Sequence, residues 1–213
     1  MGESLLVEGM SPIRKKEFKV QMPPISTIMH FGKIFIESYD KVDVPNFMIG
    51  MISPSTFNDD ELEELHNFDE DGNLDVREFY EQFNFKTMNL KEKSIRLGYY
   101  CHLWFDEYYK FNASKLTIHN KLNLNDQELR RAVKDLLLYY DNKAIGNFYE
   151  KYIEDINTVD TKTFEMIDIE KSKKILFEYL NEKKPIDAMT NLIKEEQYMS
   201  LIKAGCSKII NSL

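Results

Sequence analysis

The chain has 213 residues, of which 43% are hydrophobic and 30% charged, and its formal net charge at pH 7 is −8. This composition excludes a disordered chain and fits one globular domain with a buried core. The acidic balance argues against duplex nucleic acid as a partner, because phosphate binding needs a basic surface. Eight glycines and six prolines are too few for a turn-rich β-sandwich or barrel.

Cysteine usage and the N-terminus indicate a cytoplasmic location. Cys101 and Cys206 are far apart and form no C-x-x-C pair, which argues against a disulfide framework and a thiolate metal site. The apolar patch Leu5–Val7 is too short for a signal-peptide core. No apolar run reaches the roughly 18 residues of a membrane span, so we expect no transmembrane segment.

Residues 1–22 lack helical periodicity and predict a flexible N-terminal arm, and residues 23–213 are expected to form a single helical domain. Beyond the prolines at 23 and 24, Ser26 or Thr27 is the expected cap of a helix that runs to about Tyr39. The stretch 44–56 is interpreted as a loop or a short helix, and a further short helix is expected over 58–68.

Three capping-box patterns predict the starts of the following helices. They begin at Asp75, Asn89 and Asn125, each with Glu three residues later. The helix opened by Asn89 should run past Tyr109, and apolar residues surround its axis, which predicts a central, buried position. The helix opened by Asn125 should run to about Tyr140.

Helices over 145–156, about 169–183 and 186–211 complete the chain, with Pro185 at the start of the last, and 157–168 is expected to be irregular. No alternating strand pattern of convincing length occurs. The sequence therefore predicts an all-α, single-domain multi-helix bundle.

His102 and Asp106 are the most informative pair of polar residues in the chain. They are four residues apart on the expected central helix, so both project from one face and both are zinc-ligand types. Gly98 lies one turn earlier on that face and leaves room for a neighbouring backbone or a ligand. Considered alone, the pattern favours a His–Asp hydrogen bond within the core over a metal site.

The segment 67–78 fits the spacing of an EF-hand calcium loop. Oxygen-bearing residues occupy loop positions 1, 3, 5, 9 and 12, and Gly72 occupies position 6. Asn67 at position 1 departs from the pattern. A tight Asp-Gly turn, with Asp75 capping the next helix, explains the segment equally well.

Three segments together resemble the zinc-dependent phospholipase C family, whose superfamily also includes single-strand-specific nucleases. They are Gly50–Pro54, His66–Gly72 and Leu97–Asp106, and the last carries the sharpest motif, G-Y-x-x-H-L-x-x-D. The resemblance covers roughly residues 23–110 and is strongest to small bacterial members. It implies a helical bundle of the phospholipase C/nuclease type. Family members carry an acidic turn after the same histidine, which weakens the calcium interpretation of 67–78.

The resemblance also implies a zinc site formed by His66, His102 and Asp106, at which an activated water attacks a phosphodiester. Three protein ligands and a water are a viable catalytic zinc arrangement. The implied substrate is a small phosphoester or a lipid-derived one, and no Ser or Cys nucleophile is required.

Departures from the family pattern argue against further zinc ions. Ser55 replaces the aspartate that follows the family's proline, and Ile28 occupies the position of its early histidine. His30 lies two residues later and is retained as a candidate ligand, although two helix positions rotate it by about 200°. No H-x-x-x-E pair follows Asp106, and Asp135 and Asp141 are conceivable substitutes without a supporting motif.

We therefore expect a metal-dependent phosphoester hydrolase with one zinc ion. Two alternatives stay open. The chain could be a degenerate, non-catalytic relative that acts as a binding or partner module, or a single EF-hand-like protein that binds calcium at 67–78.

Overall fold

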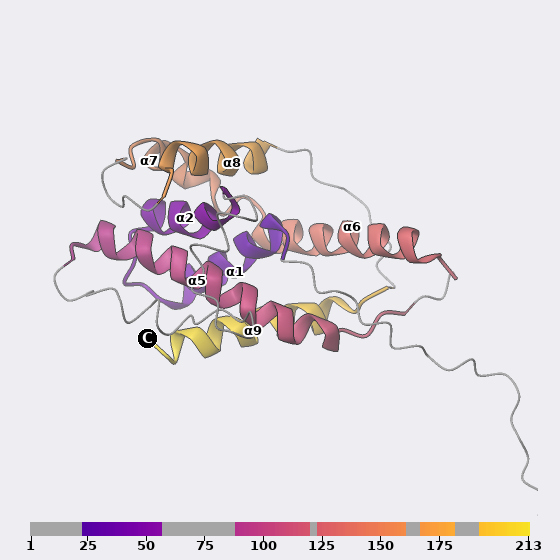
Figure 1. Ribbon diagram of the computed structural model, residues 1–213. Coiled ribbons are helices and arrows are strands. Elements are labelled where there is room, and N and C mark those ends of the chain that lie inside the picture. Colours follow the sequence, from indigo (N-terminus) through magenta and orange to yellow (C-terminus); the bar gives the residue numbers. More distant parts are fainter. Residues whose placement is uncertain (1–22, 57–87, 120–122, 161–166, 182–191) are drawn as a thin grey trace, which may run out of the picture.

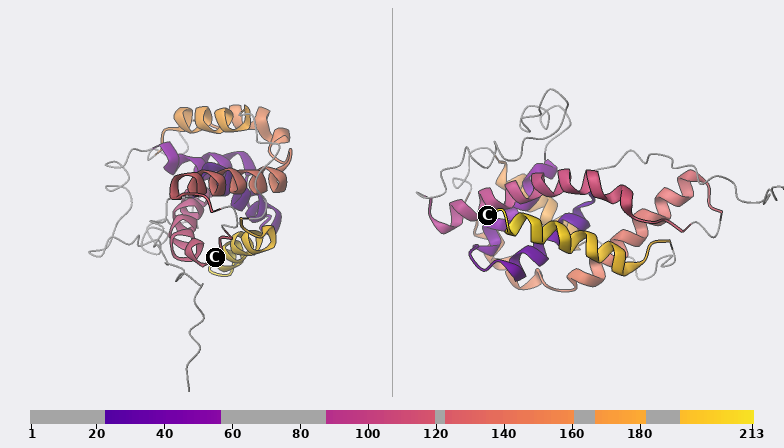
Figure 2. Two further views of the ribbon diagram at one scale, coloured as in Figure 1. Left: turned by 90° about the vertical axis from the view of Figure 1, so that its right-hand side faces the viewer. Right: turned by 90° about the horizontal axis from the view of Figure 1, so that it is seen from below.

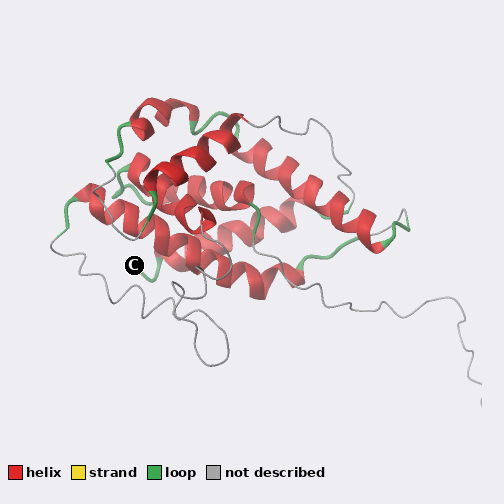
Figure 3. Ribbon diagram, turned by 45° about the horizontal axis from the view of Figure 1, so that its top comes forward, coloured by secondary structure: helices red, strands yellow, loops and turns green. Residues whose placement is uncertain are grey.

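The computed structural model describes residues 23–56, 88–119, 123–160, 167–181 and 192–213. Helices and their connections make up all of these ranges, which contain no β-strand (Figure 3). The all-α prediction is confirmed. None of the described helices combines the length and apolar character needed to cross a membrane.

The described elements follow one another as α-helices separated by short 3-10 turns and irregular connections. In chain order the α-helices are α1 (Ile25–Ser38), α2 (Val44–Ile52), α5 (Leu90–Asn112), α6 (Asp126–Ile145), α7 (Ile153–Asn157), α8 (Ile169–Asn181) and α9 (Glu195–Ile210). Helix α1 contacts α2, α5, α6 and α9, so it lies at the centre of the bundle (Figure 1). Helix α8 packs on α2 on the side away from α9 (Figure 2).

Two of the predicted capping boxes are present in full. Asn89 and Asn125 each accept a hydrogen bond from the backbone N–H three residues later, and the glutamate at that position accepts one from the cap's own N–H. The two longest described helices, α5 and α6, therefore begin where the sequence predicts. The third pattern, at Asp75, and the expected helix over 58–68 lie outside the described residues, as does the expected arm over 1–22.

The first predicted cap is wrong. Helix α1 begins at Ile25, so Ser26 and Thr27 lie inside its first turn, and Pro24 at the N-cap position makes no side-chain bond. The hydroxyls of Ser26 and Thr27 instead donate to Asp141 on α6. The two hydroxyls therefore donate to a distant carboxylate, in place of accepting from the local backbone N–H groups that the capping rule assumes.

Three other predicted helices differ in extent. Helix α6 continues past its expected end near Tyr140 to Ile145. The helix expected over 145–156 is interrupted, because Gly146 has a positive φ of 55°, a conformation that ends α6, and only the short α7 follows the turn. The helix expected from residue 186 begins at Glu195 among the described residues, and Pro185 lies outside them.

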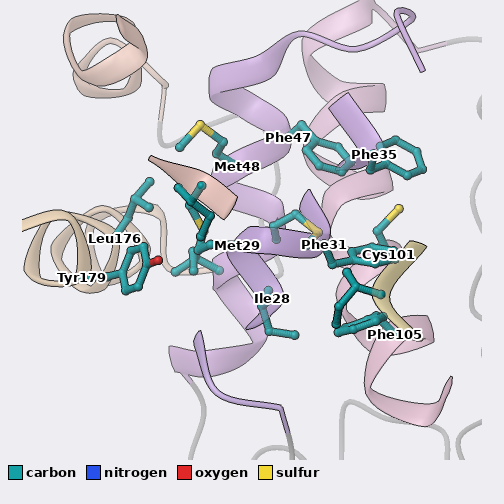
Figure 4. Close-up of a cluster of buried hydrophobic side chains, with 14 of the residues drawn as sticks. Ile28, Met29, Phe31, Phe35, Phe47, Met48, Cys101, Phe105, Leu176 and Tyr179 are labelled. Atoms are coloured by element: carbon teal, nitrogen blue, oxygen red, sulfur yellow. The ribbon is translucent and has the colours of Figure 1, made fainter. Parts of the chain in front are cut away.

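Aromatic side chains from three helices fill the centre of the core (Figure 4). Phe31 of α1 stacks on Phe105 of α5 with ring centroids 4.2 Å apart, and Phe35 of α1 stacks on Phe47 of α2 at 4.9 Å. All four rings are fully buried. Because such rings bury large apolar areas, they account for much of the stability that holds α1 between α2 and α5.

Helices α2 and α5 approach so closely that their backbones touch at two glycines. A Cβ atom at Gly98 would come within 3.0 Å of the Phe47 carbonyl oxygen, and one at Gly50 would do the same to the Ile95 carbonyl. The expectation that Gly98 leaves room for a neighbouring backbone is confirmed. Side chains at either position would push the helices apart.

The same helices run parallel in a register that two hydrogen bonds fix. The Asp43 amide donates to the Ser94 hydroxyl near the start of the pair, and the Met51 carbonyl accepts from His102 near its end. In both bonds the partners are 51 residues apart in sequence. The register is therefore constant over two turns of helix.

We expect Gly98→Ala to lower the free energy of unfolding by about 1–3 kcal/mol, the usual cost of overpacking, because its new methyl group meets backbone that cannot rotate away. Gly205→Ala on α9 is the matched control, since its close neighbours belong to the Tyr108 and Phe105 side chains. Urea denaturation measures both. Equal losses in the two variants would contradict the backbone contact.

Candidate functional site

The His102 imidazole lies between two oxygen acceptors at the α2–α5 contact. Its Nδ1 is 2.5 Å from the Met51 carbonyl oxygen, and its Nε2 is 3.2 Å from Oδ2 of Asp106, one turn further along α5. A carbonyl only accepts, so Nδ1 carries the hydrogen. The predicted pairing of His102 with Asp106 on one helix face is confirmed.

The Asp106 carboxylate is only half satisfied. Its side chain is 10% exposed, and Oδ1 is buried with no hydrogen-bond partner among the described residues. Buried carboxylate oxygens are normally hydrogen-bonded or bound to a cation, so an orphaned one calls for a ligand or a proton. Together with Nε2 of His102 it supplies the nitrogen and oxygen donors that zinc accepts.

Opposing effects act on the protonation of His102. Burial lowers the pKa of the imidazole, but the Asp106 charge and the hydrogen bonds with Asp106 and the Met51 carbonyl raise it, and the net result lies above the ordinary 6.5. Both ring nitrogens face hydrogen-bond acceptors, which stabilise the protonated ring and explain why its pKa is raised. Without a metal the imidazole therefore keeps its second proton to a higher pH than a free histidine does.

A second His–Asp pair lies deeper in the bundle. Nδ1 of His30 on α1 is 2.9 Å from Oδ1 of Asp141 on α6, and both side chains are almost fully buried. The same carboxylate accepts from Ser26 at 3.0 Å, from Thr27 at 2.8 Å and from Tyr198 of α9 at 2.7 Å. Four donors thus saturate Asp141 and join α1, α6 and α9.

The chemistry of the second pair is that of a structural network. Both oxygens of Asp141 already have two partners each, which is the satisfaction that a buried carboxylate requires. Burial and the neighbouring Asp141 hold the pKa of Tyr198 well above its usual value, so its hydroxyl keeps the proton that it donates. Sequence reasoning did not find the roles of Ser26, Thr27 and Tyr198, because their hydrogen-bond partners are 57 to 171 residues away in the sequence.

The remaining predicted site residues are dispersed or lie outside the described part of the chain. Ile28 is buried in the core, and Asp135 lies exposed on α6. His66 and the segment 67–78 lie outside the described residues. Among the residues that the structure describes, no three His, Cys, Asp or Glu side chains gather as a metal-binding group. The zinc ligation of His66, His102, Asp106 and His30 stays a prediction.

Comparisons with protein-family models, with curated proteins and with solved structures found no match to this chain. The functional argument therefore depends on the residues themselves.

We expect Asp141→Asn to lower the free energy of unfolding by about 3–5 kcal/mol, because an amide nitrogen would face donors that now point at a buried carboxylate. Asp135→Asn on the exposed face of the same helix is the control and should have little effect. Urea denaturation compares the two. Similar stability of both variants would show that the network contributes little.

The raised pKa of His102 predicts how the stability contributed by the His102–Asp106 pair depends on pH. Because the folded-state pKa lies above the unfolded value, the contribution is complete below 6.5 and is lost as the pH rises through the folded-state value. Asp106→Asn should therefore destabilise the metal-free protein more at about pH 6 than at about pH 9. Urea denaturation in the presence of a chelator measures this difference, and a pH-independent difference would contradict the prediction.

Proposed function

We propose that His102 and Asp106 are two ligands of a zinc-type divalent metal and that the protein is a metal-dependent phosphoester hydrolase. The observation that carries the proposal is the half-open His–Asp pair. Nδ1 of His102 is held by the Met51 carbonyl, and the donors offered to a cation are Nε2, which faces Oδ2 of Asp106, and the unpartnered Oδ1 of the same carboxylate. The family resemblance implies His66 as the third ligand.

The orientation of His102 matches what metal sites require. A ligating histidine usually donates its other ring N–H to a carbonyl or carboxylate, which fixes the tautomer and the direction of the ring. The Met51 carbonyl has this role here. The Asp106 carboxylate adds negative charge in a mostly buried environment, where its attraction for a cation is stronger than in water.

When bound, zinc supplies an activated water and offsets negative charge on the phosphoryl oxygens. In this proposal His102 and Asp106 hold the ion, and the neighbouring Cys101 does not compete as a nucleophile. Burial and the neighbouring Cys206 raise the pKa of Cys101 well above its usual value, so its thiol stays protonated and is a poor nucleophile. The position of Cys101 beside His102 therefore does not favour cysteine catalysis. A small or lipid-derived phosphoester is the proposed substrate class.

Zinc titration of the chelator-treated protein by calorimetry tests the metal site. We expect one zinc ion per chain, with binding abolished or weakened by at least about tenfold in His102→Ala and Asp106→Asn. His119→Ala is the matched control, because His119 lies at a loop outside the pair and should leave binding unchanged. Equal zinc affinity in all variants, or no binding by the wild type, would overturn the proposal.

Measurements of catalytic turnover separate the hydrolase proposal from the two alternatives. Hydrolysis of bis(p-nitrophenyl) phosphate or of a short-chain phospholipid should require zinc and be lost in His102→Ala. Zinc binding without turnover would favour the non-catalytic binding module. Calcium binding that survives His102→Ala and is lost in Asp69→Ala would favour the EF-hand alternative at 67–78.

A further inference from the structure

The hydrogen bond that orients His102 uses a backbone carbonyl, so its geometry depends on where helix α2 lies. A backbone oxygen such as that of Met51, unlike a side-chain acceptor, cannot rotate to follow the imidazole. This carbonyl belongs to the last turn of α2, and the residue three positions on, in the 3-10 turn over Ser53–Thr56, is Pro54, which has no N–H to donate to it. It is thus available to accept from outside its own helix.

The two glycines adjoin this bond on both sides of the interface. Gly50 immediately precedes Met51 on α2, and Gly98 lies one turn before His102 on α5. A methyl group at either position would meet backbone of the opposite helix, at the Ile95 carbonyl or the Phe47 carbonyl. Since backbone cannot rotate away, the helices would have to separate and the Met51 oxygen would withdraw from Nδ1.

We propose that Gly50 and Gly98 are positioning residues of the metal site: their contact holds the Met51 carbonyl against Nδ1 of His102 and so presents Nε2 for ligation. This inference rests on the proposed function for its metal, but the hydrogen bond on which it depends is a property of the metal-free chain. The glycines touch no ligand and act through the Met51 backbone.

The register supports this role over a simple need for tight packing. The bond from Asp43 to Ser94 and the bond from His102 to Met51 share one sequence offset, and the glycine contact lies between them. A shift of α2 by one turn along α5 would remove the Met51 oxygen from His102 and the Asp43 amide from Ser94. The glycines, which allow backbone to interlock with backbone, oppose such a shift.

The test measures zinc affinity and the ¹⁵N NMR signal of the protonated Nδ1 of His102 in the same proteins. Gly98→Ala should lower zinc affinity by about 10- to 100-fold, the usual cost of disturbing a partner of a ligand, and should remove the hydrogen-bonded Nδ1–H signal from the metal-free protein. Gly205→Ala, a buried helical glycine opposite side chains only, should change neither quantity.

A second variant avoids any change in packing. Replacing Ile52 by its α-hydroxy acid analogue converts the amide after Met51 into an ester, whose carbonyl is a weaker acceptor. We expect weaker zinc binding and a shifted Nδ1 signal, whereas the same exchange at Ile49, one turn earlier in α2, is the control and should leave both unchanged. This variant decides the question if Gly98→Ala does not fold.

The outcomes separate this inference from the proposed function. Wild-type zinc affinity and an unchanged Nδ1 signal in Gly98→Ala or in the Ile52 ester would overturn the positioning role even if the protein is a zinc hydrolase. Failure of the wild type to bind zinc would overturn the proposed function. A merely structural role for the glycines would lower stability without moving the Nδ1 signal, and this result would also overturn the inference.

Discussion

The backbone contact between α2 and α5 is the constraint on which the rest of the candidate site depends. It occurs where Gly50 and Gly98 face the carbonyls of the opposite helix, and nothing larger than hydrogen fits there. Two hydrogen bonds with one sequence offset fix the register of the pair. One of them ends on His102, so the packing of the two helices and the orientation of the imidazole have a common cause.

The two buried His–Asp pairs have the same residue types but different chemistry. Around Asp141, hydroxyls from α1 and α9 complete the hydrogen bonding, and the carboxylate has no remaining capacity. Around Asp106, one oxygen faces His102 and the other lacks a partner among the described residues. A saturated carboxylate stabilises a fold, whereas an unsaturated one attracts a cation or a proton. This difference decides which pair is the candidate site.

The hydrophobic core explains why both pairs can be buried. Stacked rings from α1, α2 and α5 exclude water from the centre of the bundle and keep the helices at fixed distances. In such surroundings each polar group must find its partner within the protein. The hydroxyls of Ser26 and Thr27 therefore donate to Asp141 from the first turn of α1, whose N-cap position is Pro24.

The sequence by itself determined the helical class, the starts of α5 and α6, and the shared face of His102 and Asp106, because these depend on spacing and on contacts within three or four residues. It misjudged the start of α1 and the break after Ile145, where a distant carboxylate and a positive-φ glycine override the local pattern. Only the tertiary structure decided that Asp141 is saturated and that Met51 orients His102, since partners 51 to 171 residues apart meet through packing and not through local periodicity.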